Sequence, residues 1–535
     1  MSGNKMLKGA AVIGAAGIMV KVIGAFFRVP LTNWIGQLGM SYYQVAYLIY
    51  STLLVMATAG FPVAISRMVS ENVARNRYGN AYKVFRVSLT IMGILGIILS
   101  GICYFGAGLL STRVGNPNAE PAVKAIALAL LFVPLLSSFR GFFQGRQNMK
   151  PTAVSEIIEQ LVRVAVGLSL AHLLLSKGLP QAAAGAAFGA SAGAGASLLL
   201  MILIFGLSKK FIKKQISLGS DYADETGEIV KKVFLIAIPI IIGAEVVPIM
   251  NALDMGIVMR RLQATGWSAV ESQGLYGLIS AYCTTLINLP QFLIQAIAIS
   301  LVPAIASASA SGNREEVEAN TSLGYRLTMM IACPCTFGIL ALAKPILFML
   351  YPARMEEAAN AAPTLMILAI SILTLAIYET TTGVLQAIGK QMIPVINVAI
   401  GAVVKILISF IFVGIPVINI KGAAAGTVIA YLIASILNSR AVSKHVRPSI
   451  DPDRTYIRPI VAAAVMGGIA FLVHRGAAAV LGNSLGTLLA VLAGVIAYGL
   501  LVILLKIVTP QELATIPIGA RLNRVIGKII PGWHE

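Results

Sequence analysis

The chain has 535 residues, of which 58% are hydrophobic and only 12% are charged. A soluble globular domain carries about 25% charged residues, so this chain has too few charges to cover a water-facing surface of its size. Lipid is therefore the predicted solvent for most of the protein. The net charge of +20 could indicate a nucleic-acid partner. Where the basic residues lie along the chain tells whether they serve nucleic-acid binding or membrane topology.

Apolar segments of about 20 residues, the length that spans a bilayer, follow one another along nearly the whole sequence. They predict an all-α polytopic membrane protein with about 14 transmembrane helices. The predicted spans are 8–32, 41–66, 84–110, 121–145, 152–176, 183–207, 232–259, 275–306, 324–350, 361–388, 391–415, 422–442, 457–479 and 484–508. The connections between them are too short to hold a soluble catalytic domain.

The basic residues follow a topological pattern. Of the 41 Lys and Arg residues, 28 lie in the termini and the even-numbered connections or in the span ends that border them, and 9 lie in or beside the odd-numbered connections. The positive-inside rule then places both termini in the cytoplasm. The positive charge is thus a topology signal rather than a nucleic-acid footprint, and no nucleic-acid partner is predicted.

Two short patterns recur at almost the same offset. The segment 141–144, GFFQ, is followed by Arg163, and the segment 383–386, GVLQ, is followed by Lys405, each nineteen residues after the glutamine. The offset is 242 residues, and a Pro-x-x-x-Ser pattern beginning at Pro62 recurs 241 residues later. Six predicted spans separate the equivalents, so the repeat is parallel, with its axis along the membrane normal.

The repeat predicts two pseudo-symmetric six-helix lobes and two extra helices. The expected organisation is an N-terminal lobe at 1–207, a cytoplasmic inter-lobe loop at 208–231, a C-terminal lobe at 232–445, helices 13 and 14 at 446–508, and a cytoplasmic amphipathic tail at 509–535.

Ionisable residues at membrane depth are costly and indicate function by default. Lys21 and Arg28 stand seven apart on one face of the first span. With Arg163 and Lys405 they predict a cationic cleft that binds an anionic headgroup. Candidates for ion coupling or gating are Glu159, Glu245, Asp254 and Glu379. Glu159 could equally form a structural i, i+4 pair with Arg163.

The other polar residues give no indication of a binding or catalytic site. Arg140 and Arg146 flank the end of the fourth span and are interpreted as membrane-surface anchors. The four cysteines lie in apolar segments, and the four histidines show no metal-ligand spacing. Neither a metal site nor a catalytic constellation is predicted, and no ATP-binding motif is visible. The expected protein is not an enzyme and needs no cofactor.

Three segments carry a family resemblance: KGAAVIGAAGIMVKVIG at 8–24, AGFPVAIS at 59–66 and FRGFFQGRQNMKPTAVSEIIEQLVRV at 139–164. The chain resembles the polysaccharide-biosynthesis and stage V sporulation protein B branch of the multidrug/oligosaccharidyl-lipid/polysaccharide (MOP) flippase superfamily. This branch is close to the MurJ-type lipid II flippases of Gram-positive bacteria. The resemblance extends over nearly all predicted helices and implies a cationic central cavity and alternating access.

The chain also differs from the lipid II flippases at several positions. Lys21 stands where lipid II flippases carry a first-helix arginine, which keeps the charge but loses the bidentate fork. Tyr43 and Gln44 stand where those proteins carry an acid. Some relatives bind sodium through an acid in helix 7 and an Asn-x-x-x-Asp pattern in helix 11. Here Asn397 is a further candidate for ion coupling, but Gly401 follows it four residues later.

The predicted function is a flippase that moves lipid II, the undecaprenyl-pyrophosphate-linked peptidoglycan precursor, from the inner to the outer leaflet. The expected partners are this glycan lipid and membrane lipids, and the expected state is a monomer in the bacterial plasma membrane. Coupling stays open between Na⁺, H⁺ and the membrane potential alone. The alternatives are a flippase for a capsule, exopolysaccharide or teichoic unit, a cation-coupled multidrug exporter, and a membrane-embedded glycosyltransferase.

Overall fold

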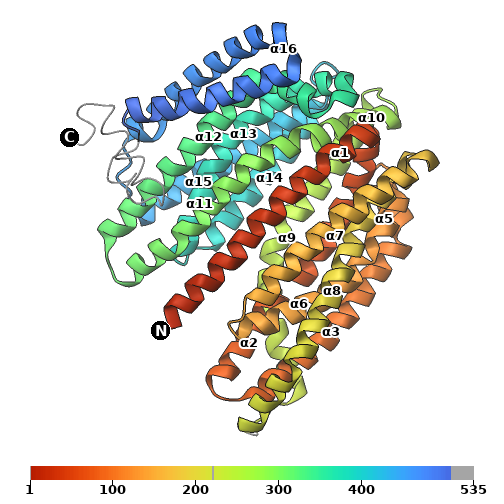
Figure 1. Cartoon of the computed structure of the whole chain (residues 1–535), viewed down its shortest axis with the longest axis vertical. Coiled ribbons are helices and arrows are strands. Elements are labelled where there is room, and N and C mark those ends of the chain that lie inside the picture. Colours follow the sequence, from red (N-terminus) through yellow and green to blue (C-terminus); the bar gives the residue numbers. More distant parts are fainter. Residues whose placement is uncertain (1, 220–221, 508–535) are drawn as a thin grey trace. The chain divides into compact units, whose positions relative to one another are not determined.

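The computed structural model describes residues 2–219 and 222–507, with side chains described from residue 16 onward except residue 18 (Figure 1). Every regular element in these ranges is a helix. The predicted amphipathic tail at 509–535 and residues 220–221 of the predicted inter-lobe loop lie outside the described residues.

The α-helices in chain order are α1 (Ser2–Thr58), α2 (Phe61–Ala74), α3 (Tyr78–Phe105), α4 (Ala107–Arg113), α5 (Glu120–Ala127), α6 (Ala129–Gly145), α7 (Lys150–Leu174), α8 (Leu179–Leu218), α9 (Thr226–Ala264), α10 (Ala269–Gly277), α11 (Thr284–Ala310), α12 (Arg314–Leu350), α13 (Met355–Ala387), α14 (Met392–Val413), α15 (Lys421–His445) and α16 (Arg458–Leu504). Two π-helical segments, η3 (Leu278–Cys283) and η5 (Asp453–Ile457), precede α11 and α16.

Twelve helical segments of the described chain are long and apolar enough to cross a membrane. Two of them, Met19–Ala74 and Asp453–Leu504, contain 56 and 52 residues. A straight helix of that length would reach about 80 Å, more than twice the hydrocarbon core of about 30 Å. Each is broken by a glycine with positive φ, Gly36 at 62° and Gly482 at 78°. Each is therefore long enough for two crossings. The predicted all-helical membrane fold is confirmed.

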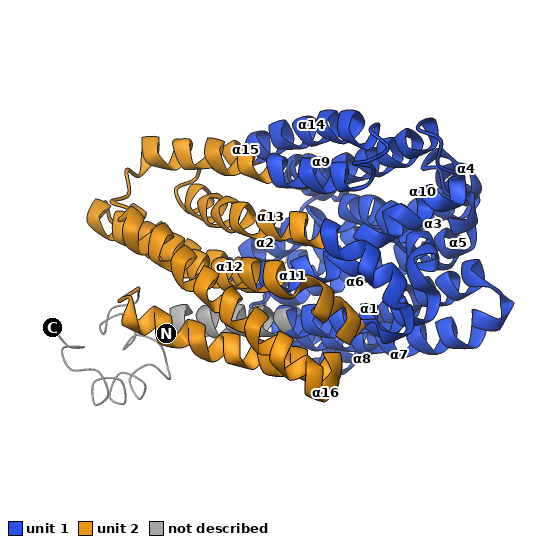
Figure 2. Cartoon of the chain, turned by 90° about the horizontal axis from the view of Figure 1, so that it is seen from above, with its two compact units in different colours: residues 1–292, 351–364, 395–430 blue, residues 293–350, 365–394, 431–535 orange. Residues whose placement is uncertain are grey.

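The described residues form two compact units, coloured separately in Figure 2. Unit 1 comprises the chain up to Phe292 together with Tyr351–Thr364 and Val395–Ala430. Unit 2 comprises Leu293–Leu350, Leu365–Pro394 and residues from 431 onward. These bounds do not test the predicted lobes, so the lobe division stays a prediction.

The connection between α8 and α9 is shorter than the predicted loop because both helices extend into it. Asp224 anchors this connection on α3. Its carboxylate accepts hydrogen bonds from Asn80 Nδ2 (2.9 Å) and from the Tyr222 hydroxyl (2.8 Å). Burial raises the pKa of Asp224, but these hydrogen bonds and nearby Lys232 together lower the pKa below its ordinary value. The connection is thus held by a charged group rather than by apolar packing.

A stripe of glycines on α8 lets the backbone of α7 approach closely, and the two helices lie side by side (Figure 1). A Cβ atom on Gly189 would lie 2.5 Å from the carbonyl oxygen of Arg163. A Cβ atom on Gly193 would lie 2.4 Å from the carbonyl oxygen of Glu159. Small residues at four-residue spacing are the usual device for tight helix packing in lipid. The stripe therefore fixes the position of the polar face of α7.

Replacing Gly189 with alanine should destabilise the protein, because the added methyl group has no room against the α7 backbone. We expect a loss of about 1–3 kcal/mol, the usual cost of overpacking, seen as a lower melting temperature in detergent. Gly206→Ala on the same helix is the matched control, since nothing lies within 4 Å of its Cβ position. Equal melting temperatures for both variants would contradict the packing argument.

Candidate substrate-binding cavity

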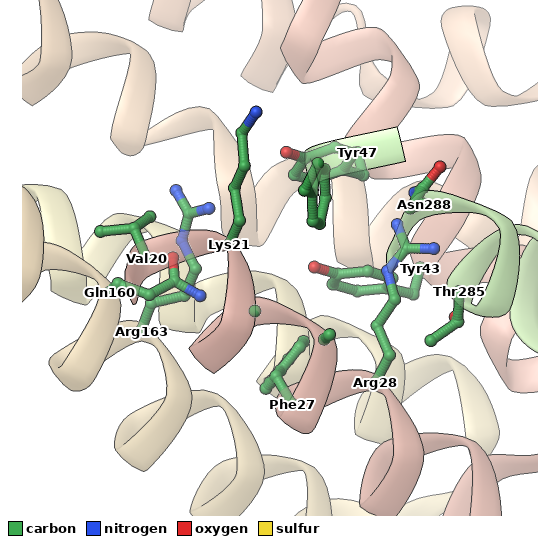
Figure 3. Close-up of a pocket in the computed structure, with 13 residues that line it drawn as sticks. Val20, Lys21, Phe27, Arg28, Tyr43, Tyr47, Gln160, Arg163, Thr285 and Asn288 are labelled. Atoms are coloured by element: carbon green, nitrogen blue, oxygen red, sulfur yellow. The ribbon is translucent and has the colours of Figure 1, made fainter. Parts of the chain in front are cut away.

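A cavity of about 290 Å³ lies within unit 1 and is lined by residues of α1, α7 and α11 (Figure 3). Its volume is near the lower end of small-molecule sites, which span about 300–1,000 Å³. Its charged lining residues are Lys21, Arg28 and Arg163, and no carboxylate lines it. Its uncharged polar lining residues are Tyr43, Tyr47, Gln160, Thr285 and Asn288. The structure thus brings together three of the four cations that the sequence proposed for headgroup binding.

Arg28 is held in this cavity by neutral partners. Its Nη1 donates a hydrogen bond to the carbonyl oxygen of Ser280 (3.2 Å), and its Nη2 donates one to Gln44 Oε1 (3.3 Å). Ser280 belongs to η3, and single π-helical turns inside membrane helices often occur at functional sites. Because neither partner carries a charge, the guanidinium is oriented without being neutralised.

Lys21 stands two turns before Arg28 on α1. Its ammonium lies 4.7 Å from the centre of the Phe292 ring, which is a cation–π distance. An aromatic ring attracts a cation without supplying a negative charge. The ring of Phe292 thus holds Lys21 at the cavity without adding a negative charge.

Arg163 belongs to a mostly buried cluster with Glu159 and Arg140. Glu159 Oε1 lies 3.5 Å from Arg163 Nη2, and Glu159 Oε2 lies 2.9 Å from Arg140 Nη2. Each of these side chains is only 16% exposed. The interpretation of Arg140 as a membrane-surface anchor was wrong, because the α6–α7 packing turns this side chain toward Glu159. Two guanidinium groups thus share the carboxylate of Glu159.

Lys405 does not line the cavity. Its Nζ lies 3.0 Å from Asp254 Oδ2, and Ser409 Oγ donates a hydrogen bond of 2.9 Å to Asp254 Oδ1. Asp254 is buried in α9, and Lys405 and Ser409 stand one turn apart on α14. A buried carboxylate needs such compensation. Lys405 and Asp254 thus form an ion pair within unit 1.

The remaining candidates for ion coupling lie on three different helices. Glu245 is buried in α9. Glu379 lies in unit 2, where it accepts a hydrogen bond of 3.0 Å from Gln295 Nε2. Asn397 lies on α14, outside the cavity lining. Among the described residues, no group of three or more His, Cys, Asp or Glu side chains could hold a metal ion. Their predicted part in coupling stays a prediction.

A second polar cluster joins the Gly36 turn of α1 to the start of α13, again within unit 1. Glu357 Oε2 accepts hydrogen bonds from the backbone amide of Gln37 (2.6 Å) and from the Tyr282 hydroxyl (2.7 Å). Arg354 Nη1 lies 3.6 Å from Glu357 Oε1, and Arg354 Nη2 donates to the carbonyl oxygen of Trp34 (2.9 Å). We call Arg354 and Glu357, with the turn residues they hold, the turn latch.

Sequence reasoning missed the turn latch and the role of Arg140. The available signal for the latch was weak: a glycine between two apolar segments, and an acid three residues after an arginine in a short connection. For Arg140, nothing in the local sequence distinguishes a cation that reaches a surface from one that reaches a carboxylate on the next helix.

The sequence matches the family described as polysaccharide biosynthesis protein over residues 6–309 and the MatE family over residues 279–411. Three proteins of Bacillus subtilis (strain 168) are similar over most of their length. The uncharacterized membrane protein YabM is 27% identical, covering 97% of this chain and 96% of that protein. Stage V sporulation protein B is 26% identical, covering 98% and 99%. Lipid II flippase MurJ is 25% identical, covering 87% of each.

Solved structures share the fold. The inward closed conformation of lipid II flippase MurJ superposes with a TM-score of 0.68 at 16% identity, covering 92% of this chain and 98% of that one. An inward-facing multidrug resistance MATE transporter of the MOP superfamily superposes with a TM-score of 0.67 at 14% identity, covering 80% and 94%. The polysaccharide biosynthesis match alone covers more than half of the chain. This multi-pass membrane protein therefore belongs to the polysaccharide biosynthesis protein family, within the MOP flippase superfamily.

Proposed function

We propose that this protein is a flippase for lipid II, and that Lys21, Arg28 and Arg163 bind the diphosphate of the cargo. One observation carries the proposal: a cavity among membrane-spanning helices is lined by three cations and by no carboxylate. Cations at membrane depth are costly, and Glu159, the partner of Arg163, is shared with Arg140. A diphosphate is the group that would compensate the positive charge of the lining.

The chemistry of the three cations suits a diphosphate. A guanidinium presents a planar fork of donors that matches phosphate oxygens, whereas a lysine acts as a compact point charge. Gln44 accepts from Arg28 without neutralising it. The low dielectric of the membrane interior strengthens each of these contacts compared with water. The polyprenyl tail would remain in lipid while the headgroup occupies the cavity.

The same geometry disfavours a multidrug exporter for cationic compounds. Such a site needs carboxylates that face the substrate. Here Asp254 is paired with Lys405, Glu159 is shared by two arginines, and neither lines the cavity. A flippase for another undecaprenyl-linked glycan fits the cavity as well as lipid II does, because the diphosphate is common to both. The resemblance to the flippase MurJ of Bacillus subtilis favours lipid II.

The turn latch gives alternating access a physical basis. In the charge-based topology, the first and ninth connections, which contain Gln37 and Glu357, lie on the external side. Their hydrogen bonds hold the external connections together. Export of the headgroup would require these bonds to break. Hydrogen bonds to charged groups contribute about 1.5–3 kcal/mol each, an amount that bound cargo or the membrane potential can offset.

The driving force follows from the charge of the cargo. An inside-negative potential favours outward movement of an anion by about 2.3 kcal/mol per charge per 100 mV. Lys405 places an ammonium where a coupling cation would otherwise meet Asp254. We therefore infer that the potential, rather than a sodium gradient, drives transport.

Lys21→Ala and Arg28→Ala should each reduce transport about 10- to 100-fold, because each removes a charge-assisted contact worth about 1.5–3 kcal/mol. The measurement uses bacteria whose own lipid II flippase can be switched off. It records how much lipid II becomes accessible to an externally added lipid II-cleaving enzyme. Arg67→Ala is the matched control, since Arg67 pairs with Glu71 on an exposed helix face.

Full transport by both cavity variants would overturn the cationic site. Absence of any lipid II movement by a folded, membrane-inserted wild-type protein would overturn lipid II as the cargo. It would leave the diphosphate site to be tested with another undecaprenyl-linked glycan.

Glu357→Ala should loosen the turn latch and favour opening toward the outside. With a cysteine introduced at Thr285, which lines the cavity, we expect a membrane-impermeant thiol reagent added outside to label it about tenfold faster in the Glu357→Ala background. The wild-type cysteines are buried or partly buried and give the background rate. Glu356→Ala, an exposed neighbour, should leave labelling unchanged. If both variants label alike, Glu357 does not hold a gate.

Transport by the wild-type protein should be the same in sodium chloride and in choline chloride. Lys405→Ala should lower the free energy of unfolding by about 3–5 kcal/mol, because it leaves the buried carboxylate of Asp254 without its partner. Sodium should then raise the melting temperature of that variant, but not that of the Asp254→Asn/Lys405→Ala double variant. Sodium-dependent transport by the wild-type protein would refute this view of Lys405.

A further inference from the structure

A second cavity, of about 490 Å³, lies within unit 2 where three helix ends meet. It is formed by the turn between α11 and α12, the turn between α13 and α14, and the end of α15. Its charged lining residues are Arg314, Lys390, Lys444 and Arg447, with Glu318 as the one acid. We propose that this cavity is a binding site for a phosphate-bearing anion, distinct from the cargo cavity.

The cations of this cavity outnumber its acid by four to one. Within the part of the chain that the structure describes, none of the four forms an ion pair with a carboxylate. Nearby basic residues behave differently, since Arg454 pairs with Asp451 (3.8 Å) and Arg458 pairs with Asp453 (2.7 Å). The cluster therefore carries a net positive charge around a hollow, and an anion would compensate it.

Glu316, at the start of α12, does not supply the missing charge. Its carboxylate accepts a hydrogen bond from Asn313 Nδ2 (3.1 Å), and its backbone amide donates to Asn313 Oδ1 (3.2 Å). This reciprocal arrangement caps the helix. The acid is engaged in fixing the turn and is absent from the cavity lining.

The three turns share one backbone feature but differ in one residue. Each helix is followed by a residue in the left-handed region: Gly312 at φ 73°, Gly389 at φ 75° and Arg447 at φ 56°. Glycine is the usual residue at such a helix end. A side chain there costs on the order of 1–2 kcal/mol. Strain of this kind concentrates at functional positions, and here it keeps a guanidinium at the cavity.

The location of the cavity indicates which phosphate-bearing ligands can reach it. The three connections are all even-numbered in the chain, so the charge-based topology places the cavity at the cytoplasmic face. Val317, Ile388 and Val446 add apolar surface to its lining. Guanidinium and ammonium groups beside apolar surface suit a phosphate group at a membrane boundary. The phosphate could belong to an anionic lipid headgroup or to a soluble diphosphate, and these sources can be separated.

The test uses the full chain with either inorganic pyrophosphate in detergent or nanodiscs of phosphatidylglycerol compared with phosphatidylcholine. The variant is Arg447→Gly/Lys390→Gln, which removes two cations and relieves the left-handed strain. The control is Lys209→Gln/Lys213→Gln, which removes two exposed cations from the end of α8. Melting temperature without ligand reports folding, and we expect the cavity variant to equal or exceed the wild type.

A rise of several degrees with pyrophosphate, lost in the cavity variant and kept in the control, would support a soluble phosphate ligand. A rise only in phosphatidylglycerol nanodiscs, lost in the same variant, would support a lipid headgroup. No stabilisation by either probe, or equal stabilisation of all proteins, would overturn the site. If the double variant is unstable, the single variant Lys390→Gln tests the same proposal. We then expect a fivefold or greater loss of affinity for the stabilising probe. The result is independent of transport, so it cannot be confused with failure of the proposed cargo.

Discussion

The cost of placing charge among membrane helices governs how this protein is built. Several ionisable groups of the described helices and turns are paired with a partner of opposite sign: Lys405 with Asp254, Arg140 and Arg163 with Glu159, and Arg354 with Glu357. Arg28 differs from these groups, because a carbonyl and a neutral amide orient it. The difference separates ion pairs that hold helices together from a charge kept available for an anion.

Close helix packing makes this arrangement possible. The glycines of α8 bring α7 near enough that the backbone of Arg163 and Glu159 contacts the neighbouring helix. A helix fixed by its backbone can present charged side chains in one orientation. In lipid, where apolar contact gives no driving force between helices, such backbone proximity stabilises the structure through van der Waals contact. The chemistry of the cavity therefore depends on residues that have no side chain.

The two cavities use positive charge in different ways. In unit 1 the cations stand on helices and face a small space with aromatic and amide neighbours. In unit 2 they stand at helix ends around a larger space and are mostly exposed. The first arrangement suits tight binding of a buried diphosphate. The second suits a ligand that arrives from the surface and exchanges with solvent.

The sequence by itself determined the membrane class, the helix windows and the placement of Lys21 and Arg28 on one face, because hydropathy and helical periodicity are local properties. It also supported the resemblance, since the segments that carry it are contiguous. It could not determine which charges are compensated. Arg140 and Glu159 lie on different helices, as do Lys405 and Asp254, and each pair forms only when those helices pack. Tertiary structure thus decided which cations remain for a ligand, because an ion pair depends on distance in space and not on spacing along the chain.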